Sequence, residues 1–226
     1  MATAAVGFEK ITLRVLDGKE ATLGENEFEV YGKTNEGATS SAKISGLAVE
    51  PVKTWGSNKV YNISGKGVGD GKIDIDIIDL PDKVLSQILG YKMDEDGVII
   101  VDSEVQAPAC SILIEDSDIR GNKYMLGFFS GVFSYDGIEL DTAQGKATEI
   151  KADTVSFAIG SNDAGQYMTK YSGDDTTAQN AVRSSLQLSV GTPQQVSAPQ
   201  TQPQVQPQAP STPAPTQSEP TEDTEG

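Results

Sequence analysis

Residues 72–90 (KIDIDIIDLPDKVLSQILG) constrain the fold of this chain more than any other stretch, because two different periodicities follow each other there. Polar and apolar residues first alternate, and this period of two predicts a strand with one buried and one solvated face. The apolar positions of this strand are Ile73, Ile75 and Ile77, and its polar positions are Lys72, Asp74 and Asp76.

The apolar residues that follow recur at helical spacing and predict a short helix. Asp79 is expected to cap its start, Pro81 suits its first turn, and Gly90 is expected to end it. A helix of about ten residues does not persist alone in water. We therefore expect its apolar stripe to pack against the isoleucine face of the strand. The stripe consists of Val84, Leu85, Ile88 and Leu89.

Further alternating or apolar segments predict strands along the rest of the chain. Roughly eight to ten strands and one firm helix favour a mainly β sandwich or barrel over a parallel α/β sheet. The segments are 10–16, 27–31, 43–49, 59–63, 97–101, 108–115, 124–133 and 148–159, with an edge strand at 166–171 and a weak helical pattern at 178–186.

Several residues have an expected place relative to the core. Segment 124–133 (YMLGFFSGVF) is apolar on both faces, so it needs a second cover besides the core, for which another subunit is the candidate. Segment 97–101 (GVIIV) is expected to be a buried strand. Trp55 is expected in the core or at its rim, and Cys110 is expected to be a small buried apolar residue.

The composition excludes several classes of function. The chain has no histidine, which removes the usual imidazole base and the commonest transition-metal ligand. Its formal net charge is −16, without the basic clusters that bind phosphates, so tight nucleic-acid binding is not expected. Asp74 and Asp76 share one strand face, but nothing predicts a cleft around them. We expect no enzyme and no catalytic, cofactor-binding or metal-binding residues.

Two loops only superficially resemble ligand-binding motifs. The glycine-rich loop 65–72 lacks the Walker and dinucleotide spacings and leads into a strand, so it is predicted to be a flexible or closely approached loop. The acidic segment 94–97 (DEDG) lacks the residue order of a calcium loop and is predicted to be a solvated turn.

The chain is expected to consist of one folded domain, residues 1–190, and a tail, residues 191–226. Gln and Pro dominate the tail, which carries too little apolar area to fold and is predicted to be disordered and acidic. The start lacks a signal-peptide pattern, and no apolar run approaches the ~20 residues that span a bilayer. The expectation is therefore a soluble protein without disulfides.

The order and spacing of these pieces resemble the major tail protein, or tail tube protein, of long non-contractile-tailed bacteriophages (siphophages) of Gram-positive bacteria. The resemblance spans about residues 5–175. It is carried by residues 71–91 (GKIDIDIIDLPDKVLSQILGY), 96–100 (DGVII), 108–110 (PAC), 121–124 (GNKY) leading to 131–134 (GVFS), and 153–157 (DTVSF).

The resemblance implies a β-sandwich or split barrel with one flanking helix, similar to the tube protein of type VI secretion. It implies hexameric rings that stack into the tail tube, a conduit through which DNA is ejected without specific binding. It also implies assembly in the host cytoplasm, a final place in the virion tail, and partners such as tape measure and tail terminator proteins, with no cofactor and no membrane.

Two questions stay open at this level. Lys72, Asp74 and Asp76 are candidates for the tube lumen or a subunit contact, and loop 32–41 is a candidate for ring-to-ring contacts; an ordinary solvated outer face is the alternative for the three polar residues. A different class of function is a monomeric β-sandwich carbohydrate-binding module with a Pro-rich linker. The lack of a secretion signal and the few exposed-looking aromatic residues argue against that class.

Overall fold

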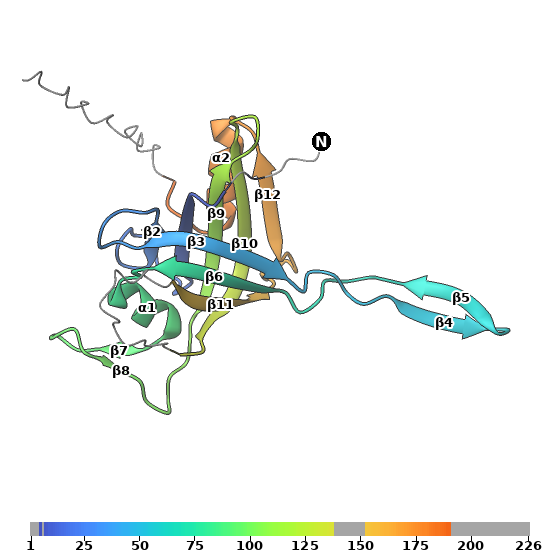
Figure 1. The fold of residues 1–226 in the computed structure, drawn as a ribbon, viewed down its shortest axis with the longest axis horizontal. Coiled ribbons are helices and arrows are strands. Elements are labelled where there is room, and N and C mark those ends of the chain that lie inside the picture. The colour runs from blue at the N-terminus through green and yellow to red at the C-terminus, as the bar shows by residue number, and fades with distance from the viewer. Residues whose placement is uncertain (1–4, 6, 138–151, 191–226) are drawn as a thin grey trace, which may run out of the picture. The chain divides into compact units, whose positions relative to one another are not determined.

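The alternating isoleucine strand predicted from the sequence is β6 (Lys72–Ile78), which lies between β3 (Ala38–Ser45) and β11 (Asp153–Gly160) in the main sheet. Ile73, Ile75 and Ile77 are at most 1% exposed, so the predicted buried face is confirmed. Figure 1 shows this computed structural model, which describes residues 5, 7–137 and 152–190.

The other strands of the described residues are short, apart from β9 and β10. The main sheet is antiparallel in the order β2-β1-β9-β10-β11-β6-β3, with β12 paired to β10, and it is not closed. The hairpins β4–β5 and β7–β8 stand outside it. The bounds are β1 (Lys10–Val15), β2 (Glu27–Val30), β4 (Val52–Gly56), β5 (Lys59–Ser64), β7 (Lys92–Met93), β8 (Ile99–Ile100), β9 (Ala109–Ser117), β10 (Lys123–Tyr135) and β12 (Met168–Ser172).

β10 joins two groups of strands, one formed by β2, β1, β9 and β12 and the other by β11, β6 and β3, and its pairing is irregular between them. Its first half pairs with β12 and its second half with β11, while its pairing with β9 shifts between Phe128 and Gly131. A Cβ atom at Gly131 would lie 2.3 Å from the carbonyl oxygen of Ala158 and from the ring of Phe157. Glycine is therefore required where β10 approaches β11.

The main core lies between these two groups of strands, whose directions cross in Figure 1. This arrangement agrees with the predicted mainly β, sandwich or split-barrel class, which is confirmed. The largest completely buried apolar residues of this cluster are Ile11, Leu13, Ile73, Ile75, Ile88, Ile112, Phe128 and Phe157, all 0% exposed.

The predicted helix is α1 (Asp82–Leu89), and it packs as expected. Val84, Ile88 and Leu89 belong to the same core cluster as the β6 isoleucines. Gly90 ends the helix in the left-handed conformation (φ 72°), as predicted. The expectation that Asp79 caps the helix is wrong: the cap residue is Pro81, without a side-chain hydrogen bond, and Asp79 occupies the preceding turn with φ 55°.

The weak helical pattern near the end of the domain corresponds to a second helix, α2 (Thr176–Ser185). Asp175 caps it by accepting a hydrogen bond from the Thr177 backbone N–H at 2.9 Å. The helix and the residues after it cover the outer face of β9 and β10, where they form a second buried cluster. This cover was expected from another subunit, but for this part of β10 the chain supplies it itself. The cluster contains Leu113, Met125, Val182, Leu186 and Leu188.

Buried charges hold α2 in place beside that cluster. The guanidinium of Arg183 lies 3.2 Å from the carboxylate of Glu115 and 3.5 Å from that of Glu27. The backbone N–H of Ser189 also donates to Glu27 at 2.7 Å. Since Glu27 and Glu115 are almost completely buried, removing one partner would leave an uncompensated charge. The network therefore fixes α2 and the residues that follow it against β2 and β9.

Two expectations about burial are wrong, while a third is confirmed. Trp55 is 66% exposed, and β8 has only two residues and exposes Ile100 by 51%, because both hairpins lie outside the main sheet. Cys110 is 0% exposed, as predicted, and burial raises the pKa of its thiol to about 12. The predicted tail, residues 191–226, and residues 148–151 of the predicted last strong strand lie outside the described residues. Neither described helix is long and apolar enough to cross a membrane.

Two isoleucines that differ in burial test this account of the core. Replacing Ile75 by alanine is expected to lower the free energy of unfolding by about 2–5 kcal/mol, since it leaves a cavity in the main core. Ile63→Ala, at a position that is 58% exposed, is the matched control and is expected to change it by less than about 0.5 kcal/mol. Urea denaturation of the unassembled chain measures both, and equal effects would contradict the assignment of the core.

Candidate interaction surfaces

The hairpin formed by β4 and β5, here called the arm (residues 52–64), extends away from the main sheet in Figure 1. Its strands are joined by Ser57 and Asn58, both with positive φ (52° and 61°). This is the backbone of a two-residue hairpin turn, for which asparagine is well suited. Every residue of the arm except Gly56 is exposed. The arm is thus a regular structure that the described residues leave uncovered.

One face of the arm carries three apolar side chains and one lysine. Trp55 is paired with Val60 and Lys53 with Ile63, so these four side chains share that face. Trp55 is 66% exposed and Ile63 is 58% exposed. On the other face, Tyr61 lies against Gly56 and is 79% exposed. Grouped exposed apolar side chains of this kind mark an interaction surface.

Close backbone contacts at the base of the arm require glycine. A Cβ atom at Gly46, which has φ 70°, would lie 2.1 Å from the carbonyl oxygen of Asp70. One at Gly69 would lie 2.4 Å from the carbonyl oxygen of Gly46 and 2.6 Å from that of Ala48. The glycine-rich loop is therefore closely approached by another backbone segment, which was one of the two expectations for it.

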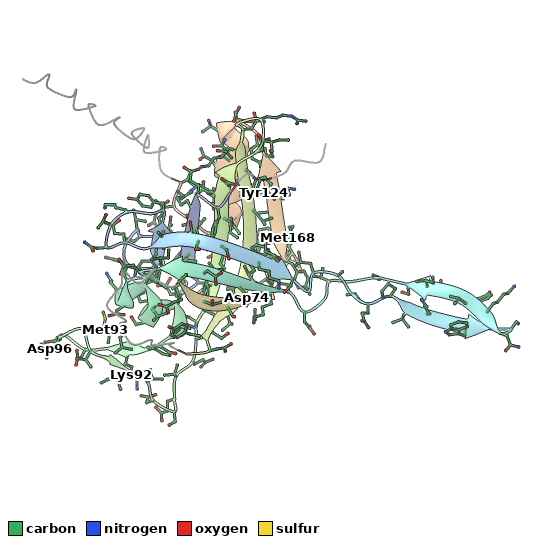
Figure 2. The ribbon with its side chains drawn as sticks, in the orientation of Figure 1. Asp74, Lys92, Met93, Asp96, Tyr124 and Met168 are labelled. Atoms are coloured by element: carbon green, nitrogen blue, oxygen red, sulfur yellow. The ribbon has the colours of Figure 1, made fainter. Side chains whose placement is uncertain are left out.

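A second exposed hairpin, here called the acidic hairpin (residues 92–104), consists of β7, β8 and the turns beside them. Asp94 forms its tip as a turn, accepting hydrogen bonds from the backbone N–H of Asp96 (3.0 Å) and of Val98 (2.8 Å). This confirms the prediction of a solvated turn. Lys92 pairs with Asp102 at 2.5 Å. Figure 2 shows Lys92, Met93 and Asp96 at this hairpin. Its exposed apolar side chains are Met93, Val98, Ile100 and Val101.

The structure brings the predicted candidates Lys72, Asp74 and Asp76 together on the partly exposed face of β6, where Figure 2 labels Asp74. Lys72 Nζ lies 2.9 Å from Asp74 Oδ1, which also accepts a hydrogen bond from Ser156 of β11 at 2.8 Å. Lys72 and Ser156 lower the pKa of Asp74, in that order.

Asp76 is held from both neighbouring strands. Its two carboxylate oxygens accept hydrogen bonds from the hydroxyls of Ser41 on β3 and Thr154 on β11, each at 2.6 Å. These bonds, Ser41 first, lower the pKa of Asp76 because they stabilise the ionised form. The polar face of β6 thus presents two carboxylates that hydroxyls from β3 and β11 hold in place, with Lys72 paired to one of them. It includes no cluster of three metal-ligating residues, and none was found elsewhere in the described part of the chain.

The arm was not predicted as a surface from the sequence. A strand was predicted at 59–63, but neither β4 nor its pairing was, and Trp55 was expected in the core or at its rim. A signal was nevertheless present, because residues of high strand propensity flank Ser57-Asn58 on both sides. What the pattern could not give is that no layer of the same chain covers the hairpin.

Comparison with known proteins gives one family. The family model described as phage tail tube protein matches residues 1–185. No curated protein matches the chain.

The hydrogen bonds of Asp76 lead to a pH prediction. Ser41→Ala is expected to raise the pKa of Asp76 toward the ordinary carboxyl value, since one bond to the ionised form is lost. A carboxyl group with a lowered folded pKa stabilises the fold above its unfolded pKa, near 4, and this contribution is lost as pH falls through the folded value. The variant is therefore expected to be less stable at pH 7, by an amount that shrinks below about pH 4.

An NMR titration of the side-chain carboxyl groups in the unassembled chain measures the pKa, and denaturation at several pH values measures the stability. Ser40→Ala is the matched control, because the Ser40 hydroxyl makes no side-chain hydrogen bond within the described residues. An unchanged pKa of Asp76 in Ser41→Ala would contradict the proposed cause.

Proposed function

The chain belongs to the phage tail tube protein family, and from this premise we propose that its copies close into hexameric rings that stack into the tail tube of a siphophage of Gram-positive bacteria. A structural role in the virion tail follows from the family. In the proposal, the tube conducts DNA during ejection and meets tape measure and tail terminator proteins, and the chain assembles in the host cytoplasm. The chain is not proposed to catalyse a reaction.

The exposed apolar arm is the observation that carries this proposal. A solitary chain that leaves Trp55, Val60 and Ile63 in water on one hairpin face forgoes burial worth roughly 25 cal/mol per Å² of apolar surface. Contact with further copies would recover that burial. The arm is built by regular pairing and a tight turn, so it is available as a preformed docking element.

The unclosed main sheet supports the same proposal. β2 and β3 end the path of paired strands in the described residues. The preceding turn takes part of the β2 edge, where Glu27 bonds to Thr22 and Gly24. No strand of the described residues pairs with the outer edge of β3, and an exposed strand edge associates readily with another chain. Closure of sheets from several copies into a ring would remove such edges.

The charge of the chain suits a conduit for DNA. A net charge of −16 repels a polyanion, and without counterion release DNA is not held on the wall. In the proposal, the polar face of β6, with Lys72, Asp74 and Asp76, lines the lumen or a subunit contact. Hydroxyls on β3 and β11 hold these two carboxylates in place, which supports a defined position for their charge.

The carbohydrate-binding alternative gains one observation, the exposure of Trp55 and Tyr61, since aromatic rings can stack on sugars. That exposure removes one of the two sequence arguments against it. The rings nevertheless lie on opposite sides of a projecting hairpin, and two hollows in the described residues, beside α1 and beside β1, include neither ring. Assembly therefore accounts for the arm better.

The assembly state tests the proposal directly. The purified full chain is expected to form rings or tubes in negative-stain micrographs and to sediment as large species with increasing concentration. A chain that remains a monomer at high concentration and binds a glycan would support the alternative class and overturn the tube.

The position of the polar face is tested in the assembled tube. A cryo-EM reconstruction is expected to place Asp74 and Asp76 at the lumen wall or between subunits, because fixed charge there repels DNA or pairs with a neighbour. If both carboxylates lie on the tube exterior, the lumen assignment is wrong, whereas the assembly proposal is unaffected.

A further inference from the structure

We propose that the arm of one copy docks on the acidic hairpin of a second copy. This inference rests on the proposed assembly and deepens it by naming which two surfaces of the chain meet. It is carried by two independent properties of the hairpins, their exposed apolar side chains and their opposite charges.

The apolar surfaces of the two hairpins match in kind. The arm offers a row formed by Trp55, Val60 and Ile63. The acidic hairpin exposes Val98 by 54% and Ile100 by 51%, with Val101 following β8 at 61%. Within the described residues, both hairpins lie outside the main sheet and neither is covered by another element of it. Each is therefore an unpartnered surface with apolar area to bury.

The charges of the two hairpins are complementary. The arm carries Lys53 and Lys59 and no acidic residue, although the chain as a whole is strongly acidic. Both lysines are exposed, and neither forms an ion pair with any residue that the structure describes. The acidic hairpin has one lysine, paired with Asp102, against five acidic residues, which are Asp94, Glu95, Asp96, Asp102 and Glu104.

A second copy of this chain satisfies both properties, whereas the chain cannot satisfy them by itself. The arm and the acidic hairpin project from the sheet in different directions, with the other strands between them (Figure 1). Contact between two different patches of identical chains is heterologous, and such contacts build rings or open stacks rather than closed dimers. Opposite charge would select the acidic hairpin as the partner of the arm among the acidic surfaces of a neighbour.

Charge reversal tests the pairing. The variant Lys53→Glu/Lys59→Glu and the variant Glu95→Lys/Asp96→Lys are each expected to raise the critical concentration for assembly by about tenfold or more, since like charges would meet. A chain that carries all four changes is expected to return to within about threefold of the unchanged chain, because opposite charges meet again. Sedimentation of the full chain over a concentration series measures all three.

Two controls separate this test from folding and from net charge. All four residues are exposed, so thermal unfolding of the unassembled variants is expected to match that of the unchanged chain. Lys19→Glu/Lys66→Glu changes the net charge as much as the arm variant, but outside both hairpins, and is expected to assemble normally. Failure of the unchanged chain to assemble would refute the proposed function itself. Normal assembly of the reversed variants, or no recovery in the fourfold variant, would refute only the pairing.

Disulfide trapping gives a second readout. Cys110 is completely buried, so a cysteine placed at Lys53, on the docking face of the arm, or at Glu95 would be the reactive thiol of its chain. Under mild oxidation, a mixture of Lys53→Cys and Glu95→Cys copies is expected to form disulfide-linked dimers, whereas either variant alone is not. Absence of these dimers from assembled mixtures, or equal dimers from either variant alone, would overturn the pairing.

Discussion

The register of β6 is the constraint on which the rest of the domain depends. Ile73, Ile75 and Ile77 must face the core, and a slip of one residue would bury the carboxylates in their place. The same register puts Asp76 between Ser41 and Thr154, whose hydroxyls bond its two oxygens. Burial on one face and hydrogen bonding on the other therefore select the same pairing of β3, β6 and β11. One strand register therefore determines both which side chains form the core and where the carboxylates lie on the surface.

Local sequence patterns predicted correctly those parts of the fold in which the pattern and the tertiary burial agree. The alternation in β6, the stripe of α1 and the stop at Gly90 are of this kind, since each follows from a period or from a backbone conformation. The failures share a cause as well. Trp55 and Ile100 are apolar residues that would be buried in most settings, yet their hairpins have no layer of the same chain over them. Of the candidate surfaces, the row on β6 was named from the sequence and the arm was not, because exposure is decided by distant elements.

The first half of the double-sided apolar strand β10 is buried on both sides by elements of this chain. Leu126 and Phe128 enclose the main core, while Met125 faces α2 on the other side. The cover by α2 is held partly by charge: burial alone would raise the pKa of Glu115, but Lys10, Arg183 and Lys123 outweigh it and lower the pKa. The ionised carboxylate of Glu115 on β9 pairs with Arg183 and so holds α2 against the sheet. The outer face of β9 and β10 is therefore already occupied at α2, whereas the apolar side chains of the two hairpins stay exposed in the described residues.

Attraction at those hairpins must overcome the charge repulsion between copies of the chain. With a charge of −16 each, neighbouring chains repel, but salt screens that repulsion beyond about 8 Å at physiological ionic strength. An attraction that acts only at contact can then prevail, and apolar burial at Trp55 is of that kind. The glycines at the base of the arm contribute to the same end. Because Gly46 and Gly69 allow the two backbone segments to touch, the arm is held in shape before it meets a partner, and a preorganised element loses less conformational entropy on docking. The lysines then distinguish one acidic surface of a neighbour from the rest, so the arm combines in one short hairpin the reach, the apolar contact and the selectivity that assembly of an acidic chain requires.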